Sequence, residues 1–216
     1  MYQNDPQKVL TGEVRLSYMA VLAPKAPKNG GEPKYYVTLL IPKTDTVTKA
    51  DIDASMQAAA QEALAKTWGG VYPPSLKIPI YDGDGVRPSG VAFGDECKGH
   101  WVMTASNKNK PQVVGQDNIN VDLAPSDIYS GMYGRVTLRF YGYSHSGNKG
   151  IGCGLGNIMK TRDGKPLSGT APASSDFASV GMAVGQTIPP PVSPLGFPGS
   201  NPTGNVVINP FTGQAI

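Results

Sequence analysis

The chain of 216 residues contains only two cysteines, Cys97 and Cys153, and this scarcity excludes a framework of disulfide bonds. It also has no run of roughly 20 apolar residues, the length that a membrane-spanning helix needs. Residues 1–10 are polar and lack the apolar stretch of a secretory signal peptide. These absences predict a soluble, intracellular protein without a membrane partner.

Charged residues are also scarce, at 16% of the chain, whereas the 27 glycines and 20 prolines exceed ordinary usage. This balance favours a strand-rich and loop-rich protein over a helical bundle. Hydrophobic residues make up 39% of the chain, which is enough for a core. The formal net charge of +3 permits nucleic-acid binding without requiring it.

The C-terminal part of the chain has almost no charge, because Asp176 is the only charged residue after Pro172. Residues 188–202 read IPPPVSPLGFPGSNP, which is too rich in proline and glycine for packed structure. We therefore predict one domain over residues 1–172 and a flexible, disordered Pro/Gly-rich tail over residues 173–216. The tail is either a linker or a docking peptide that uses its apolar residues 206–208 and Phe211.

Alternation of apolar and polar residues predicts that most of the domain forms β-strands. The first strand is expected over residues 11–23, with an apolar face made of Val14, Leu16, Tyr18, Ala20 and Leu22. Other strands are expected at 34–41, 100–106, 134–144 and 151–160, with shorter ones at 76–80 and 113–114.

One helix is expected between the early strands. Thr48 is its predicted N-cap, apolar residues then recur at helical spacing, and Gly69 and Gly70 end it. Several strands with a single helix cannot form a doubly wound sheet. A small closed barrel fits better, because closure leaves no exposed strand edge.

The stretch GRVTLRFYGYS at residues 134–144 carries the strongest functional signal. Strand alternation directs its apolar residues toward a core and leaves the opposite face with Arg135, Thr137, Arg139, Tyr141 and Tyr143. Single-stranded DNA requires both chemistries of this face, cations for its phosphates and flat rings for its bases. An ordinary solvated strand face with cross-strand packing is the alternative interpretation.

Other parts of the domain repeat this combination of rings and cations. Tyr35 and Tyr36 are adjacent, so one of them must point away from the core. The remaining candidates for DNA contacts are a strand tryptophan and lysines in turns: Trp101, Lys108, Lys110 and Lys149. Lysines at 25, 28 and 34 add positive charge around the first loop. The Lys-Asn-Lys sequence before Pro111 also fits a plain solvated turn.

The chain resembles a known family, the phage single-stranded DNA-binding proteins long catalogued as a domain of unknown function. The resemblance extends from about Leu10 to Thr170. It is carried by VRLSYMAVLAPK, EPKYYVTLLIPK, GHWVMTASNKNKPQVVG, IYSGMYGRVTLRFYGY and KGIGCGLGNIMKTRDGKPLSG. It implies a mainly β OB-fold, a five-to-six-stranded Greek-key barrel with one α-helix, and single-stranded DNA as the ligand. Proteins of this family often have an acidic tail, and this chain departs from them with its single tail acid.

Two motifs suggest metal binding but fit it poorly. A zinc site would need Cys97 and His100 together with His145 and Cys153, and the second pair lacks the spacing of a compact knuckle. The DGDG sequence at residues 82–85 resembles a calcium loop but lacks the closing glutamate. We expect a buried thiol in the first case and a turn in the second.

Two further motifs suggest a nucleotide site or an enzyme. Glycines at 150, 152, 154 and 156 lack the GxGxxG spacing of a dinucleotide site and indicate a strand that another group approaches closely. The acids at 95–96 are too isolated for a metal-dependent nuclease, which needs several converging carboxylates. We therefore expect no enzyme activity, no metal and no cofactor.

Together these patterns predict a non-catalytic, sequence-tolerant single-stranded DNA-binding protein. It would act in phage DNA replication or recombination, in the cytoplasm of the infected host cell. Phage replication proteins are candidate partners, and a homodimer is left open. The alternative hypothesis is a phage structural or assembly protein that uses its Pro-rich tail for protein contacts.

Overall fold

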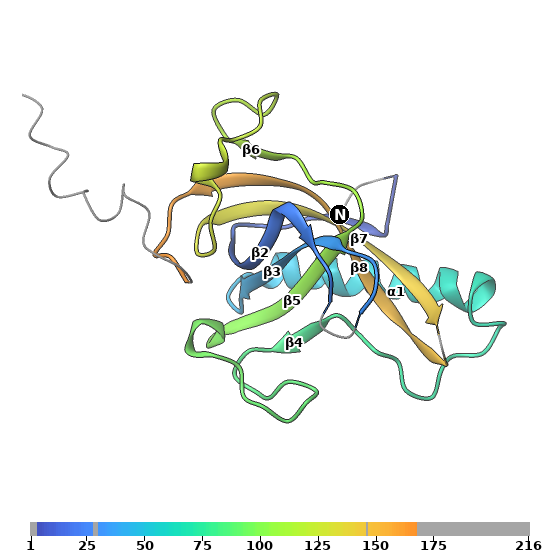
Figure 1. Ribbon diagram of the computed structural model, residues 1–216. Coiled ribbons are helices and arrows are strands. Elements are labelled where there is room, and N and C mark those ends of the chain that lie inside the picture. Colours follow the sequence, from blue (N-terminus) through green and yellow to red (C-terminus); the bar gives the residue numbers. More distant parts are fainter. Residues whose placement is uncertain (1–3, 28–29, 146, 168–216) are drawn as a thin grey trace, which may run out of the picture. The chain divides into compact units, whose positions relative to one another are not determined.

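The computed structural model describes residues 4–27, 30–145 and 147–167 (Figure 1). The strands in this part of the chain are β1 (Lys8–Leu10), β2 (Val14–Lys25), β3 (Lys34–Pro42), β4 (Ile80–Asp82), β5 (His100–Asn107), β6 (Val113–Gly115), β7 (Tyr133–His145) and β8 (Asn148–Arg162). The helix α1 (Thr46–Lys66) lies between β3 and β4, and two short 3₁₀ helices are η1 (Asp95–Cys97) and η2 (Pro125–Asp127).

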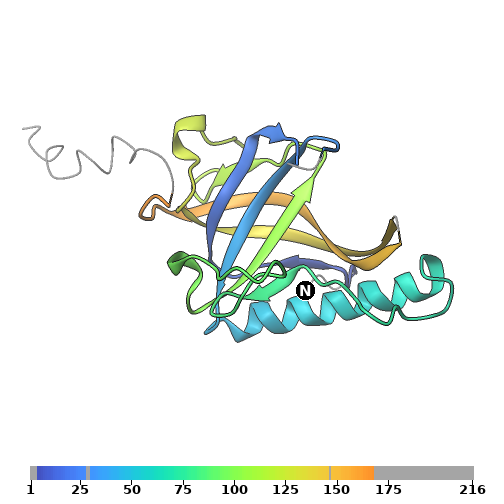
Figure 2. The same cartoon turned by 60° about the horizontal axis from the view of Figure 1, so that its bottom comes forward.

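Five of these strands close into a barrel in the order β7-β2-β3-β5-β8, because β8 pairs again with β7. Four of the pairings are antiparallel, and the pairing of β5 with β8 is parallel. Figures 1 and 2 show β2, β3 and β5 crossing the long, bent strands β7 and β8. This is the five-stranded Greek-key barrel of an OB-fold, so the predicted fold class is confirmed.

Three short strands add to the barrel from outside: β1 pairs with β7, β4 with β5, and β6 with β8. The barrel itself therefore has five strands, within the five or six that we expected, and the described residues contain three short strands in addition. The sequence did not predict β1, because three residues are too few for alternation to be visible. The strand expected at 76–80 is displaced, since β4 begins only at Ile80.

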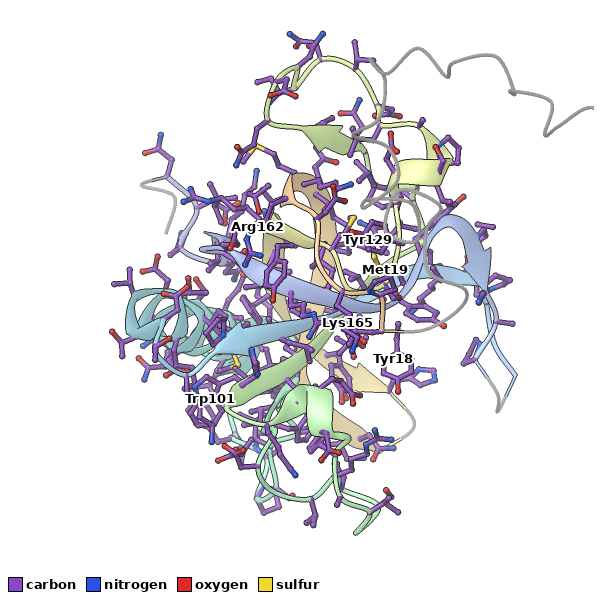
Figure 3. The ribbon with its side chains drawn as sticks, turned by 90° about the vertical axis from the view of Figure 1, so that its left-hand side faces the viewer. Tyr18, Met19, Trp101, Tyr129, Arg162 and Lys165 are labelled. Atoms are coloured by element: carbon purple, nitrogen blue, oxygen red, sulfur yellow. The ribbon has the colours of Figure 1, made fainter. Side chains whose placement is uncertain are left out.

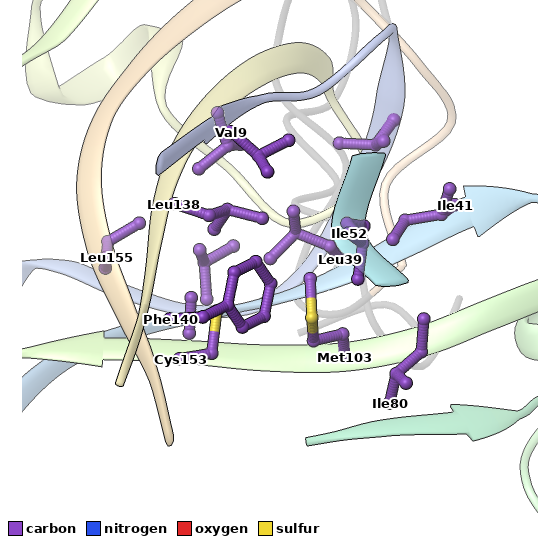
Figure 4. Packing of buried hydrophobic residues seen from close by; sticks show 14 of the residues in the cluster. Val9, Leu39, Ile41, Ile52, Ile80, Met103, Leu138, Phe140, Cys153 and Leu155 are labelled. Atoms are coloured by element: carbon purple, nitrogen blue, oxygen red, sulfur yellow. The ribbon is translucent and has the colours of Figure 1, made fainter. Parts of the chain in front are cut away.

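Strand alternation builds the core of the barrel. In β7 the side chains of Val136, Leu138 and Phe140 are buried. Arg139, which lies between Leu138 and Phe140, and Tyr141, which follows Phe140, are exposed. Figure 4 shows Phe140 and Leu138 packed among apolar side chains from β1, β3, β5 and β8. Burial of such side chains is the main stabilising term of the fold.

A β-bulge in β2 corrects the predicted face of that strand. The register with β3 shifts between Ser17 and Ala20, so the apolar alternation does not continue past Leu16. Tyr18 is consequently 57% exposed and Leu22 is 43% exposed, although both were expected on the buried face. Ser17 is buried instead. A bulge changes which side of a sheet each following residue faces.

The helix begins three residues earlier than we expected. Asp45 is the N-cap, and its side chain accepts a hydrogen bond from the backbone N–H of Thr48 at 3.0 Å. The prediction of Thr48 as the N-cap is therefore wrong, because the preceding aspartate already satisfies the free backbone donor. Figure 2 shows α1 running below the barrel. A Cβ atom on Gly142 would lie 2.1 Å from that of Ala63, so glycine in β7 lets the helix approach closely.

The predicted tail, residues 173–216, and the predicted domain boundary at residue 172 lie outside the described residues. The same holds for any docking role of residues 206–208 and Phe211. Within the described part, no helix combines the length and the apolar character needed to cross a bilayer.

Candidate nucleic-acid interface

In the β7–β8 hairpin, tyrosine side chains of β7 lie beside glycine residues of β8. Tyr141 pairs with Gly152 and Tyr143 with Gly150. A Cβ atom on Gly152 would lie 2.6 Å from Cζ of Tyr141, and one on Gly150 would lie 2.8 Å from the hydroxyl oxygen of Tyr143. The sequence predicted a close approach to this glycine-rich strand, and at Gly150 and Gly152 the approaching groups include tyrosine rings of the same protein.

Tyr141 keeps an exposed ring at this position, with 44% of its surface accessible. Partial burial raises the pKa of its hydroxyl, so the phenol is uncharged at neutral pH. An uncharged ring held flat against a glycine strand offers a face on which a base can stack.

A groove runs from this ring across the end of β5. Its first section has a volume of about 470 Å³ and is lined by Lys8, Lys34, Lys108, Arg139 and Tyr141, together with small polar residues such as Ser106 and Thr137. Its second section, of about 860 Å³, is lined by Lys25, Lys34, Tyr36, Thr104, Ser106, Lys108 and His145, among others. The two sections share Lys34, Ser106 and Lys108 and form one surface, which we call the β5 groove.

Cations outnumber acids along the β5 groove. Lys8, Lys25, Lys34, Lys108 and Arg139 line it, and Glu32 is the one acid among its lining residues. Glu32 forms a salt bridge with Lys108, and Asp5 forms one with Arg139. All four side chains are partly or largely exposed, at 29–64%. Exposed pairs of this kind are weak, so a phosphate can replace the carboxylate.

Comparison with known proteins identifies the family of this chain. The model of the Enterobacter phage Enc34 ssDNA-binding protein family matches residues 7–186. The chain belongs to this family. The resemblance inferred from the sequence is therefore confirmed.

The chain is also similar to individual phage proteins. Protein p50 of Acyrthosiphon pisum secondary endosymbiont phage 1 is 28% identical over 186 residues, covering 82% of this chain and 95% of that protein. The single-stranded DNA-binding protein from bacteriophage Enc34 in complex with ssDNA is 27% identical, with a TM-score of 0.63. It covers 75% of this chain and 90% of the other. A second structure of the same phage protein has a TM-score of 0.60 and is 27% identical, covering 80% of this chain and 90% of the other.

Four of the ten residues predicted from the sequence line the β5 groove of this Enc34-family protein: Tyr36, Lys108, Arg139 and Tyr141. Of the adjacent tyrosines, Tyr36 is therefore the one on the groove side. Tyr35 alternates with it and shares a side of β3 with the buried Val37.

Trp101 lies elsewhere, on the side of β5 that faces the core and α1. Its ring packs against the core, and the Nζ atoms of Lys43 and Lys49 lie 5.2 and 4.8 Å from its centroid. In Figure 3, Trp101 lies on the side of β5 that carries α1, and Tyr18 lies on the other. These cation–π contacts give the tryptophan a packing role in this structure.

The other predicted residues are not among those lining the groove. Arg135 is exposed on β7 but pairs with Met159, toward the other end of the barrel. Lys149 donates to the carbonyl oxygen of Trp68 at 3.4 Å, and Tyr143 covers Gly150. Lys110 is exposed in the turn after β5. The DNA contact of each predicted residue stays a prediction.

Sequence reasoning did not assign three groove lysines as contacts. Lys25 and Lys34 were recognised as loop charges only, since nothing local indicates that they line one groove with Lys108. Lys8 was missed together with β1, the strand that carries it along β7. The sequence feature common to all three is a lysine at the start or end of a strand. This feature also occurs on many unrelated surfaces, so it does not indicate a DNA contact.

The motifs that suggested metal binding have other structures. Lys43 Nζ lies 2.6 Å from both Asp82 Oδ1 and Asp84 Oδ2, so an ammonium group bridges the two carboxylates and lowers both pKa values. Cys97 is buried, which raises its thiol pKa. Among the described residues, no three His, Cys, Asp or Glu side chains gather in a metal-binding arrangement.

Proposed function

We infer that this chain is a sequence-tolerant single-stranded DNA-binding protein that acts in phage DNA replication and recombination. Membership of the Enc34 ssDNA-binding protein family supports the ligand. The β5 groove supports the mechanism, because it is the observation that combines cations with accessible tyrosine faces on one surface. OB-folds bind oligonucleotides on their second and third strands and the loops beside them. In this barrel those elements are β3 and β5, and they line the groove.

In this mechanism the five groove cations bind phosphates and release the counterions of the strand. Tyr36 and Tyr141 stack on bases, which tolerates any sequence because every base has a π face. No step requires a bond to form or break, so we propose a non-enzymatic protein without a cofactor. Its place of action would be the cytoplasm of the infected cell, where replication exposes single strands.

Fluorescence anisotropy with a labelled oligothymidine tests the proposal, with a duplex of equal length as the comparison. We expect tight binding to the single strand and weak binding to the duplex. Five phosphate contacts on a single strand predict a slope of about −3.5 in a plot of log K against log salt concentration. Equal affinity for both forms, or no binding at low salt, would contradict the proposal.

Two arginines on β7 provide a matched pair of variants. Arg139→Ala removes a groove cation, whereas Arg135→Ala removes an exposed cation outside it. We expect the first variant to bind more weakly with a slope lower by about 0.7, and the second to resemble the unmodified protein. Equal losses would show that DNA follows the whole face of β7, as the sequence alone suggested, and does not enter the groove.

A further inference from the structure

The segment that follows β6 combines negative charge with exposed apolar side chains. Residues 116–127 contain neither lysine nor arginine. Their acids, all of them exposed and without a salt bridge to another described residue, are Asp117, Asp122 and Asp127. Ile119 and Val121 lie between the first two acids and are 62% and 58% exposed. We call residues 116–127 the acidic loop.

The acidic loop is held in a fixed shape by its own hydrogen bonds. The side chain of Asn118 accepts a hydrogen bond from the backbone N–H of Asn120 at 3.0 Å. The backbone N–H of Leu123 donates to the carbonyl oxygen of Val113 at 2.8 Å, and the Leu123 side chain packs against the core. Leu123 therefore anchors the loop and leaves the two apolar side chains before it outside. A loop that is already ordered loses little conformational entropy when a partner binds it.

A pocket of opposite charge lies at the tip of the β7–β8 hairpin. It has a volume of about 390 Å³ and is lined by residues 71–75, Lys77 and residues 147–149. The described residues that line it include Lys77 and Lys149 but no acid. Val71 and Tyr72 add apolar surface, since they are 69% and 49% exposed. We call it the hairpin pocket.

The acidic loop and the hairpin pocket lie at opposite ends of the β7–β8 hairpin (Figures 1 and 2). β6, which leads into the loop, pairs with β8 from Ile158 to Lys160, whereas Lys149 lies at the start of β8. These positions are roughly 30 Å apart along the strand, because a strand rises about 3.3 Å per residue. The loop therefore cannot reach the pocket of its own chain. Complementary surfaces at opposite ends of a protein can join copies head to tail into an open row.

We propose that the acidic loop of one copy docks in the hairpin pocket of the next copy on the same DNA strand. This inference rests on the proposed function, because the DNA is what places copies side by side. The aspartates of the loop would lie beside Lys77 and Lys149, and Ile119 and Val121 would cover Val71 and Tyr72. Neither surface shares a lining residue with the β5 groove, so docking leaves the groove open to DNA.

The small size of both surfaces determines when the contact forms. Interfaces much smaller than the standard size are weak and transient in free solution. Two copies bound to one strand are tethered to each other, and this raises their effective concentration. We therefore expect separate copies without DNA and cooperative binding on strands that hold several copies.

Single charge reversals on the two surfaces provide the test. Asp117→Lys changes the acidic loop, and Lys77→Glu changes the hairpin pocket. The matched controls are Asp95→Lys and Lys98→Glu, which make the same changes of charge at a salt bridge that lies on neither surface. Ile119→Ser removes an exposed apolar contact without changing the charge. Anisotropy is measured with an oligothymidine that holds one copy and with one that holds several, the stoichiometry of each being set by native mass spectrometry.

We expect the unmodified protein and both controls to bind the long oligothymidine roughly 10-fold more tightly per site than the short one, the gain from burying one apolar side chain. Asp117→Lys, Lys77→Glu and Ile119→Ser should each lose this gain. An equimolar mixture of Asp117→Lys and Lys77→Glu should recover it, because every loop then meets a pocket of opposite charge when the two variants alternate. Ile119→Ser should not be rescued by either variant.

Equal affinity per site of the unmodified protein for both lengths would overturn the inference, and so would a mixture that binds no better than its two components. A different protein as the true occupant of the pocket would give the first result. The short oligothymidine judges the proposed function separately. All loop and pocket variants should bind it like the unmodified protein, whereas Arg139→Ala should bind it more weakly. Failure of Arg139→Ala to do so would reject the groove and not the contact between copies.

Discussion

Two acids form salt bridges with cations of the β5 groove, and we expect their removal to strengthen DNA binding. Asp5 pairs with Arg139 and Glu32 pairs with Lys108. Each pair must open before its cation can contact a phosphate. The variant Asp5→Asn/Glu32→Gln keeps the size and hydrogen-bonding capacity of both side chains and removes their charge. We therefore expect this variant to bind single-stranded DNA more tightly than the unmodified protein.

The exposure of the pairs sets the size of the effect. The side chains of Arg139 and Asp5 are 58% and 29% exposed, and those of Lys108 and Glu32 are 64% and 56% exposed. Pairs this accessible to water are worth about 0.2–1 kcal/mol, so each substitution should tighten binding by about 1.4- to 5-fold. The pairs share no partner, and their effects should be close to additive, with about 30-fold as the upper limit.

Salt dependence supplies the second readout. A cation whose acid partner has been removed contributes more fully to counterion release, so the slope of the variant should lie closer than that of the unmodified protein to the limit of about −3.5 that five full contacts set. The matched control is Asp53→Asn/Asp95→Asn, which makes the same change of charge at two acids that are paired with Lys49 and Lys98 and do not line the groove. Both variants should be measured by anisotropy over a range of salt concentrations. Equal affinities of variant and control would refute the idea that groove cations contact DNA.

Three further predictions concern single positions. Gly152→Ala should displace the Tyr141 ring and weaken DNA binding roughly 5-fold or more, yet have no further effect on affinity in a Tyr141→Ala background, as measured by a double-mutant cycle. Asp45→Ala should lower the free energy of unfolding by about 0.5–2 kcal/mol in urea titrations, because α1 loses its N-cap. The Thr161 hydroxyl lowers the pKa of Glu13, so Glu13 stabilises the fold above its unfolded pKa and this contribution is lost as pH falls through the folded pKa. Glu13→Gln should therefore lower the melting temperature at neutral pH but not in acid.

The parts of the fold that could be predicted from the sequence are those with a regular, local signal. The alternation in β7 correctly separated Phe140 from Arg139, and the glycines of β8 indicated a closely approached strand. The alternation in β2 failed past Leu16, because a bulge adds a residue without changing composition. Tyr18 was therefore expected on the buried face, although its side chain is exposed. A strained backbone conformation cannot be recognised from the alternation of apolar and polar residues.

Trp101 shows why an aromatic residue beside lysines is a weak predictor of a DNA contact. The neighbours suggested by the sequence are those of the following turn, which includes Lys108. The actual neighbours are Lys43 and Lys49, which reach it from the β3–α1 connection and from α1. Its place on β5, in step with the buried Met103, puts its ring on the core side. Tertiary contacts of this kind decide whether a ring is free to stack.

The β5 groove exists because the barrel closes. Lys34 and Lys108 come from β3 and the end of β5, whereas Arg139 and Tyr141 come from the β7–β8 hairpin. The two groups meet where Ser106 pairs in parallel with Gly154, beside a hydrogen bond of 2.7 Å from the Asn107 side chain to the carbonyl oxygen of Leu155. Local sequence signals cannot report a pairing between segments so far apart in the chain. Closure of the barrel is therefore what brings the groove residues together. A change that weakens this junction should lower both the affinity for DNA and the free energy of unfolding.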